Sequence, residues 1–217
     1  MWLENLIRKS AWELEASRKT IFQFGNSVAG ALSKNPIQDW EADLWARGLK
    51  RGLIRLEGYF FRAGSGKRSP LSFFVRNDRD LYVGLRRESI TQAATYVQLI
   101  TDYGYSRAQT CFESRWMDVA VYDRDGAAWI YAENKASPKT LEKLCDRLAN
   151  EFQTQIPEAD PAAKVVDDAL MKAHHIWKNR PRFFWAVGPT TRQSFAVRYG
   201  RQAGFSLDPI IEIPSAC

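Results

Sequence analysis

Three ionisable residues stand in two apolar, strand-like segments of this sequence. Asp118 lies near the start of MDVAVY, Glu133 and Lys135 lie at the end of AAWIYAENK, and DRDG separates the two segments. A DRDG turn favours a hairpin, which would bring Asp118 opposite the region of Glu133 to within a residue or two. Residues two apart on a strand share a face, so Glu133 and Lys135 project together while Asn134 points away. We therefore expect two carboxylates and one amine to meet on one face.

This combination of side chains predicts a metal site. Carboxylates beside apolar surface lose hydration, and binding a hard cation would compensate for this loss. Asp118, Glu133 and the carbonyl of Asn134 offer the oxygen ligands that Mg²⁺ or Mn²⁺ prefers. Such an ion activates water and offsets charge on a phosphate, while Lys135 would position the water or stabilise the transition state. The predicted chemistry is metal-assisted hydrolysis of a phosphodiester.

The elements around these residues are predicted from periodicity. Apolar residues every three to four positions indicate a helix over 87–103 that stops at Gly104. Strands are expected over 109–113, 116–122 and 127–135. Ser137 followed by Pro138 has the pattern of an N-cap and first helical residue, so a helix should run from there to about Phe152.

The flanking segments place the chain in the α/β class. After the predicted site we expect a helix over 162–177, a strand over 182–188, a short helix over 191–199 and a strand over 207–213. Before it we expect helices over 2–18 and 39–50, a connection over 27–36 and a small antiparallel meander between 53 and 86. The predicted division is an N-terminal helical and β extension, 1–85, followed by a core, 86–217.

Asp118, the Glu133-Asn134-Lys135 triplet and the order helix, three strands, helix resemble the PD-(D/E)XK nuclease superfamily, whose members include restriction endonucleases and Holliday-junction resolvases. The resemblance covers about residues 87–152. It implies a restriction endonuclease-like core, in which a central mixed β-sheet is flanked by helices. It also implies a Mg²⁺-dependent nuclease, most naturally a DNA endonuclease, with Asp118, Glu133 and Lys135 as catalytic residues.

Two features of the resemblance involve neighbouring residues. In that superfamily an acidic residue on the preceding helix often supports the metal, and Glu88 resembles this residue. Glu113, just before the hairpin, is the competing candidate. The residue before Asp118 is Met117, where the motif name has proline. This departure weakens the motif while leaving its ionisable residues intact.

Basic residues favour an anionic partner. The sequence of 217 residues contains 31 Lys and Arg against 25 Asp and Glu, a formal net charge of +6. Lys139, Lys143 and Arg147 recur every four residues along the helix after the motif, so they share one face and could contact a nucleic-acid backbone. The expected partner is DNA. Since cutting both strands of a duplex needs two sites, a homodimer is also expected.

Other function classes find little support. The sequence lacks GxGxxG, GxxxxGK[ST] and GxSxG, the motifs of dinucleotide binding, P-loop hydrolysis and α/β-hydrolase nucleophiles. Three scattered cysteines without a CxxC pair indicate reduced thiols, and the N-terminal stretch mixes charged with apolar residues. We expect a cytoplasmic protein without a membrane span. The alternative function is a catalytically inactive module of the same fold that binds nucleic acid or a protein partner.

Overall fold

A computed structural model describes residues 1–64, 70–114, 116–159, 167–200 and 204–216. The chain divides into two compact units, 1–97 and 98–217. The boundary falls within a helix, α4 (Arg87–Thr101), and lies about a dozen residues beyond the division expected from sequence.

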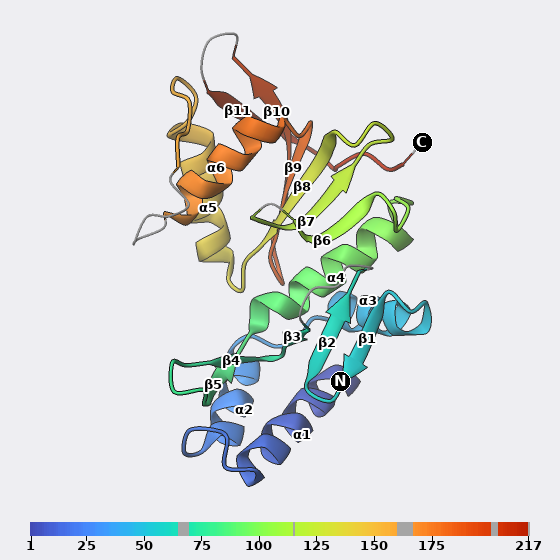
Figure 1. Ribbon diagram of the computed structural model, residues 1–217, viewed down its shortest axis with the longest axis vertical. Helices are drawn as coiled ribbons and strands as arrows, with labels where there is room; N and C mark the ends of the chain where they lie inside the picture. Colours follow the sequence, from blue (N-terminus) through green and yellow to red (C-terminus); the bar gives the residue numbers. More distant parts are fainter. Residues whose placement is uncertain (65–69, 115, 160–166, 201–203, 217) are drawn as a thin grey trace. The chain divides into compact units, whose positions relative to one another are not determined.

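The first unit combines helices with short antiparallel strands (Figure 1). Its helices besides α4 are α1 (Trp2–Ala16), α2 (Phe24–Lys34) and α3 (Asp39–Lys50). One sheet has the order β1-β2-β3, made of Ile54–Glu57, Phe60–Ala63 and Leu71–Ser72, and a separate hairpin pairs β4 (Phe74–Arg76) with β5 (Tyr82–Leu85). The predicted antiparallel meander is therefore present, divided into two sheets.

Aromatic residues dominate the core of this unit. Trp45 of α3 packs edge-on against Phe61 of β2, with ring centroids 4.9 Å apart, and its indole N–H donates to the carbonyl of Ile90 at 2.9 Å. This bond satisfies the polar atom of a fully buried side chain. It also ties α3 to α4.

The prediction of a connection over 27–36 is wrong, because α2 occupies most of that segment. Phe24, Val28 and Leu32 recur every four residues and are all buried, which is the pattern of an amphipathic helix. Gly25, in the first turn of α2, has a packing role. A Cβ atom at Gly25 would lie 2.5 Å from the ring of Trp12, so only glycine allows this close approach of α1 and α2.

The second unit is built on a mixed sheet of six strands in the order β11-β10-β9-β8-β7-β6. The strands are β6 (Thr110–Ser114), β7 (Met117–Tyr122), β8 (Ala128–Asn134), β9 (Phe183–Val187), β10 (Arg192–Tyr199) and β11 (Phe205–Ile210). Neighbours are antiparallel except β8 and β9, which run parallel. A parallel pair needs a long crossover, and here two helices supply it. The expected mixed sheet flanked by helices is confirmed.

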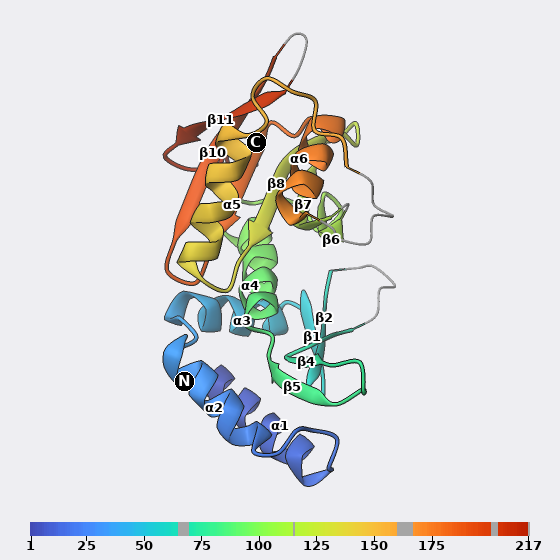
Figure 2. The same cartoon turned by 90° about the vertical axis from the view of Figure 1, so that its left-hand side faces the viewer.

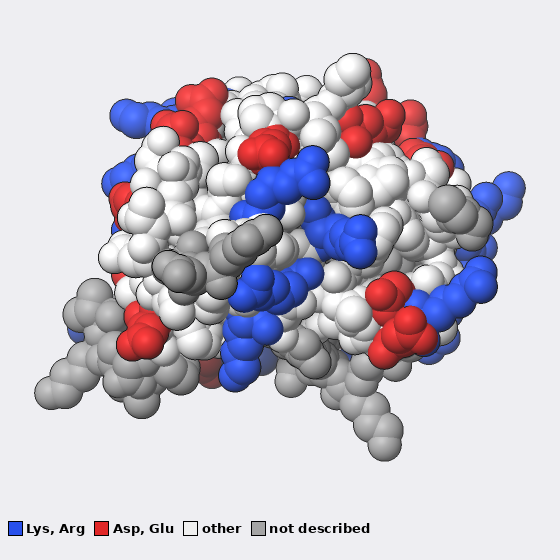
Figure 3. All heavy atoms as spheres, turned by 90° about the horizontal axis from the view of Figure 1, so that it is seen from above, with Lys and Arg blue, Asp and Glu red and all other residues white. Residues whose placement is uncertain are grey.

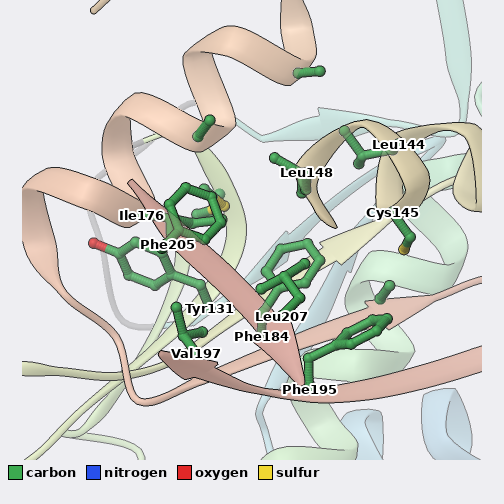
Figure 4. Close-up of a cluster of buried hydrophobic side chains, with 14 of the residues drawn as sticks. Tyr131, Leu144, Cys145, Leu148, Ile176, Phe184, Phe195, Val197, Phe205 and Leu207 are labelled. Carbon is green, nitrogen blue, oxygen red and sulfur yellow. The ribbon is translucent and has the colours of Figure 1, made fainter. Parts of the chain in front are cut away.

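Helices α5 (Pro138–Asn150) and α6 (Asp168–Asn179) form this crossover and cover one face of the sheet (Figures 1 and 2). Figure 4 shows Leu144 and Leu148 of α5 and Ile176 of α6 converging on strand residues such as Tyr131 and Phe184. As expected, the side chain of Ser137 accepts a hydrogen bond from the amide of Thr140, with Pro138 in the first turn. Burial of this apolar face is the main stabilising contribution to the unit.

One predicted helix of this unit is wrong. The segment 191–199 is strand β10, in which Phe195 and Val197 are buried two residues apart, the period of a strand. Its pairing with β9 follows a short turn in which Gly188 donates to the carbonyl of Thr191 at 2.7 Å. The helix predicted over 162–177 begins at Asp168, with Asp167 as its N-cap, and residues 162–166 lie outside the described part of the chain.

Among the described residues, no helix combines the length and the apolar character needed to cross a membrane.

Cys111 and Cys145 are free thiols, and burial raises the pKa of the Cys145 thiol to about 12.

Candidate metal centre

The β7–β8 hairpin positions the two carboxylates. Its turn is held by Asp123, whose carboxylate accepts from the amides of Asp125 at 3.0 Å and Ala127 at 2.9 Å, and Gly126 adopts φ 80°. A register shift follows at Val121/Tyr122, after which pairing is regular through Val119↔Ala132. One step further along this register, Asp118 lies opposite Glu133. Directly opposed residues share a face of the sheet, so the expected juxtaposition is confirmed.

Asp118 and Glu133 come close enough to share a cation. One carboxylate oxygen of each lies within 4.8 Å of the other. The Asp118 carboxylate also bonds to the backbone of β8, because the amide of Asn134 donates to its Oδ2 at 2.6 Å. This bond holds the Asp118 carboxylate against the end of β8. The role of the Asn134 carbonyl as a metal ligand stays a prediction.

Lys135 lies beside Glu133, as the two-residue spacing predicted. Its Nζ donates to Glu133 Oε1 at 2.9 Å and to Asp168 Oδ2 at 3.0 Å. Asp168 is the first residue of α6 and is more than half exposed, whereas the Glu133 side chain is only 1% exposed. The amine of Lys135 therefore bridges a buried carboxylate and a solvent-facing one.

A second lysine, which sequence reasoning did not identify, completes the site. Lys172 of α6 places Nζ 2.7 Å from Glu133 Oε2 and 3.8 Å from an oxygen of Asp168, and it also donates to the carbonyl of Trp116. The sequence did contain a signal for it. Lys172 falls on the buried stripe of α6 with Ala169, three residues before, and Ile176, four residues after, where an apolar residue is expected.

The electrostatics of the site centre on Glu133. Burial, followed by repulsion from Asp118, raises the pKa of the Glu133 carboxyl to about 7, although Lys172 and Lys135 act in the opposite direction. Burial alone would lower the pKa of the Lys172 ammonium group, but Glu133, Asp118 and Asp168 outweigh it, so that pKa is raised. Two nearby carboxylates, one of which resists ionisation, form a set of hard oxygen donors that a divalent cation would stabilise.

The two candidates for the accessory acid, Glu88 and Glu113, lie on different elements. Glu88 lies in the first turn of α4 and belongs to the first unit, next to Arg87, which is buried and paired with Glu41. Its role as accessory acid stays a prediction. Glu113 lies in β6 between the paired residues Phe112↔Val119 and Ser114↔Met117, and its φ of 50° is unusual for a residue with a side chain.

The basic residues of α5 do not behave alike. Lys139 and Lys143 are exposed. Arg147 makes paired hydrogen bonds of 2.7–2.9 Å to the carboxylates of Glu151 and Asp167. These bonds lower the pKa of Asp167 to about 2 and neutralise Arg147 locally, so we exclude Arg147 from the proposed nucleic-acid surface.

Within the second unit, the structure thus brings Asp118, Glu133 and Lys135 together as predicted and adds Lys172 and Asp168 from α6. Comparison of the chain with protein-family models, with curated proteins and with solved structures finds no match.

Proposed function

We propose that this protein is a divalent-metal-dependent nuclease that hydrolyses phosphodiester bonds in DNA, with a core of the restriction endonuclease-like, PD-(D/E)XK type. One observation carries the proposal: carboxylate oxygens of Asp118 and Glu133 lie within 4.8 Å, and the Lys135 amine is 2.9 Å from Glu133. Two acids that can hold a metal ion, beside a lysine that can stabilise developing negative charge, suit metal-assisted hydrolysis.

The order of elements supports this proposal. Along the chain, helix α4 is followed by strands β6, β7 and β8 and by helix α5, the order on which the resemblance rests. The strand that comes next, β9, pairs in parallel with β8 beside Glu133 and Asn134. The end of β8 is therefore held between two strands, and a backbone fixed in this way suits catalytic groups, which need precise positions.

The residues fit a metal ion of the Mg²⁺ or Mn²⁺ type. Asp118 and Glu133 would hold it, with the carbonyl of Asn134 as a further oxygen and Glu88 as the accessory acid that the resemblance implies. A bound ion would act as a Lewis acid that offsets charge on the phosphate. Lys135 would turn its amine from Glu133 to the attacking water or to a phosphate oxygen, and the solvent-facing Asp168 would orient that amine.

Positive charge supports nucleic acid as the substrate. Figure 3 shows one face of the molecule on which Lys and Arg side chains follow one another in a band. On α5, Lys139 and Lys143 are exposed four residues apart, so they lie on one side of the helix that starts just after Lys135. Neutralising phosphates with such residues gives affinity that falls with salt.

The proposal is tested by incubating the protein with linear, circular and single-stranded DNA and with RNA, in Mg²⁺, Mn²⁺ or EDTA. Cleavage should require metal, and Asp118→Asn and Lys135→Met should each lower its rate by about 100-fold or more, because each removes a group that acts on the reacting phosphate. Asp125→Asn is the matched control, since Asp125 is an exposed acid in the turn of the same hairpin. Equal cleavage by wild type and Asp118→Asn would refute the proposal.

One observation favours the alternative of a catalytically inactive module. Both oxygens of Glu133 are close to ammonium groups, Oε1 to Lys135 and Oε2 to Lys172, as in a purely structural ion network. Such a module would bind DNA or a protein without cleaving the DNA. DNA retention by wild type in a gel-shift assay, with no Mn²⁺ binding and no cleavage, would identify it.

A further inference from the structure

The two oxygens of Glu133 are held by two different lysines. Lys135 Nζ lies 2.9 Å from Oε1, and Lys172 Nζ lies 2.7 Å from Oε2. Lys135 directly follows β8, the strand that carries Glu133, whereas Lys172 comes from α6 and is 7% exposed. A divalent ion that binds Glu133 therefore either shares an oxygen with an ammonium group or takes the place of that group.

We propose that Lys172 competes with the metal ion for Glu133, so that its ammonium group and the ion bind the same carboxylate oxygen in exchange for one another. This inference rests on the metal site of the proposed function. It assigns Lys172 as a positioning residue that sets how tightly the site binds metal.

Charge and geometry both lead to this assignment. A divalent ion next to Glu133 would lie within a few ångströms of the Lys172 ammonium group, in a buried setting where like charges repel strongly. An ammonium group and a hard cation satisfy the same carboxylate, so one can take the place of the other. Lys172 thus opposes metal binding in two ways: its ammonium group occupies Oε2 of Glu133, and its positive charge repels the ion.

The displaced ammonium group has a second partner within reach. Asp168 is four residues before Lys172 on α6, one turn away, and one of its oxygens is already 3.8 Å from Nζ. Its side chain is 55% exposed, so a lysine that turns toward it regains contact with water. The exchange needs only a change in the rotamer of the Lys172 side chain, and the backbone of α6 does not have to move.

The test measures Mn²⁺ affinity, by the paramagnetic resonance signal of free Mn²⁺, in wild type and in Lys172→Met. The titration is run at about pH 8.5, because loss of Lys172 raises the pKa of Glu133 and a proton would otherwise take the place of the amine. Lys172→Met should bind Mn²⁺ about tenfold more tightly or better, since it loses the competitor. Lys178→Met, an exposed lysine of the same helix, should bind as wild type does.

A structural role for Lys172 predicts the opposite sign, because a damaged site binds metal less well. If Lys172→Met unfolds, Lys172→Gln is used in the same titration, and the circular dichroism spectrum verifies the fold of each variant. A Kd for the folded variant within about threefold of wild type, or weaker, overturns the inference.

The outcomes separate this inference from the proposed function. If Asp118→Asn abolishes Mn²⁺ binding while Lys172→Met does not tighten it, the inference alone is wrong. If Lys172→Met tightens binding but no nucleic acid is cleaved, the inference holds and the nuclease activity is refuted. If none of the proteins binds Mn²⁺, both are wrong.

Discussion

Replacing Glu133 by glutamine should change how the stability of the protein depends on pH. The pKa of this carboxyl is raised from an ordinary value of 4.5 to about 7, first by burial and then by Asp118. Between these values the folded protein keeps a proton on Glu133 that the unfolded chain has lost. The free energy of unfolding therefore falls as pH rises through this window, by about 3 kcal/mol from the size of the pKa change. Glu133→Gln cannot titrate and should lack this decrease.

The measurement is urea unfolding of wild type and Glu133→Gln between about pH 4.5 and pH 8, with EDTA present to exclude metal binding. The difference between the two curves of free energy against pH isolates Glu133, since all other titrating groups occur in both proteins. Glu142→Gln, an exposed acid on α5, serves as the control and should follow wild type. Parallel wild-type and Glu133→Gln curves across the whole window would show that Glu133 ionises normally and would refute the electrostatic reasoning.

Two further predictions follow from the same network and from the first unit. Because a metal ion must displace the proton on Glu133, Mn²⁺ affinity measured by titration calorimetry should fall about tenfold per pH unit below pH 7, and a flat profile would exclude Glu133 as a ligand. Arg87→Met should destabilise the first unit by about 3–5 kcal/mol, because it leaves the fully buried Glu41 without its paired guanidinium hydrogen bonds of 2.5 and 2.8 Å. Urea unfolding tests this, with Lys50→Met, an exposed residue of α3, expected to change stability by less than about 0.5 kcal/mol.

Local sequence determined several elements well. The helix predicted over 39–50 is α3 with the same bounds, and its N-terminus is stabilised by Glu41, which accepts from the amide of Gln38 at 2.9 Å. The start of α5 at Ser137 and Pro138 was also predicted correctly, since helix capping depends on residues only three apart. These features are encoded within one turn of chain and need no distant partner.

The two errors in secondary structure have a common cause. Segment 27–36 contains glycine, serine and asparagine, yet it is helical as far as Lys34, where Val28 and Leu32 are buried and α2 packs closely on Trp12 of α1 at Gly25. Segment 191–199 has a pattern compatible with a short helix, yet it is a strand because β9 and β11 pair with it on both sides. In both places a distant neighbour overrides weak local preference.

For the candidate site, the sequence by itself determined the ionisable residues of the hairpin, the turn between its strands and the common face of Glu133 and Lys135. Only the tertiary structure decided the register that sets Asp118 opposite Glu133, because a slip of one residue would have sent the two carboxylates to opposite faces. It also decided the partners Lys172 and Asp168, which come from a helix more than thirty residues further along the chain. Residue types and strand periodicity are local properties, whereas the burial and pairing that raise the pKa of Glu133 arise when α6 packs on the sheet.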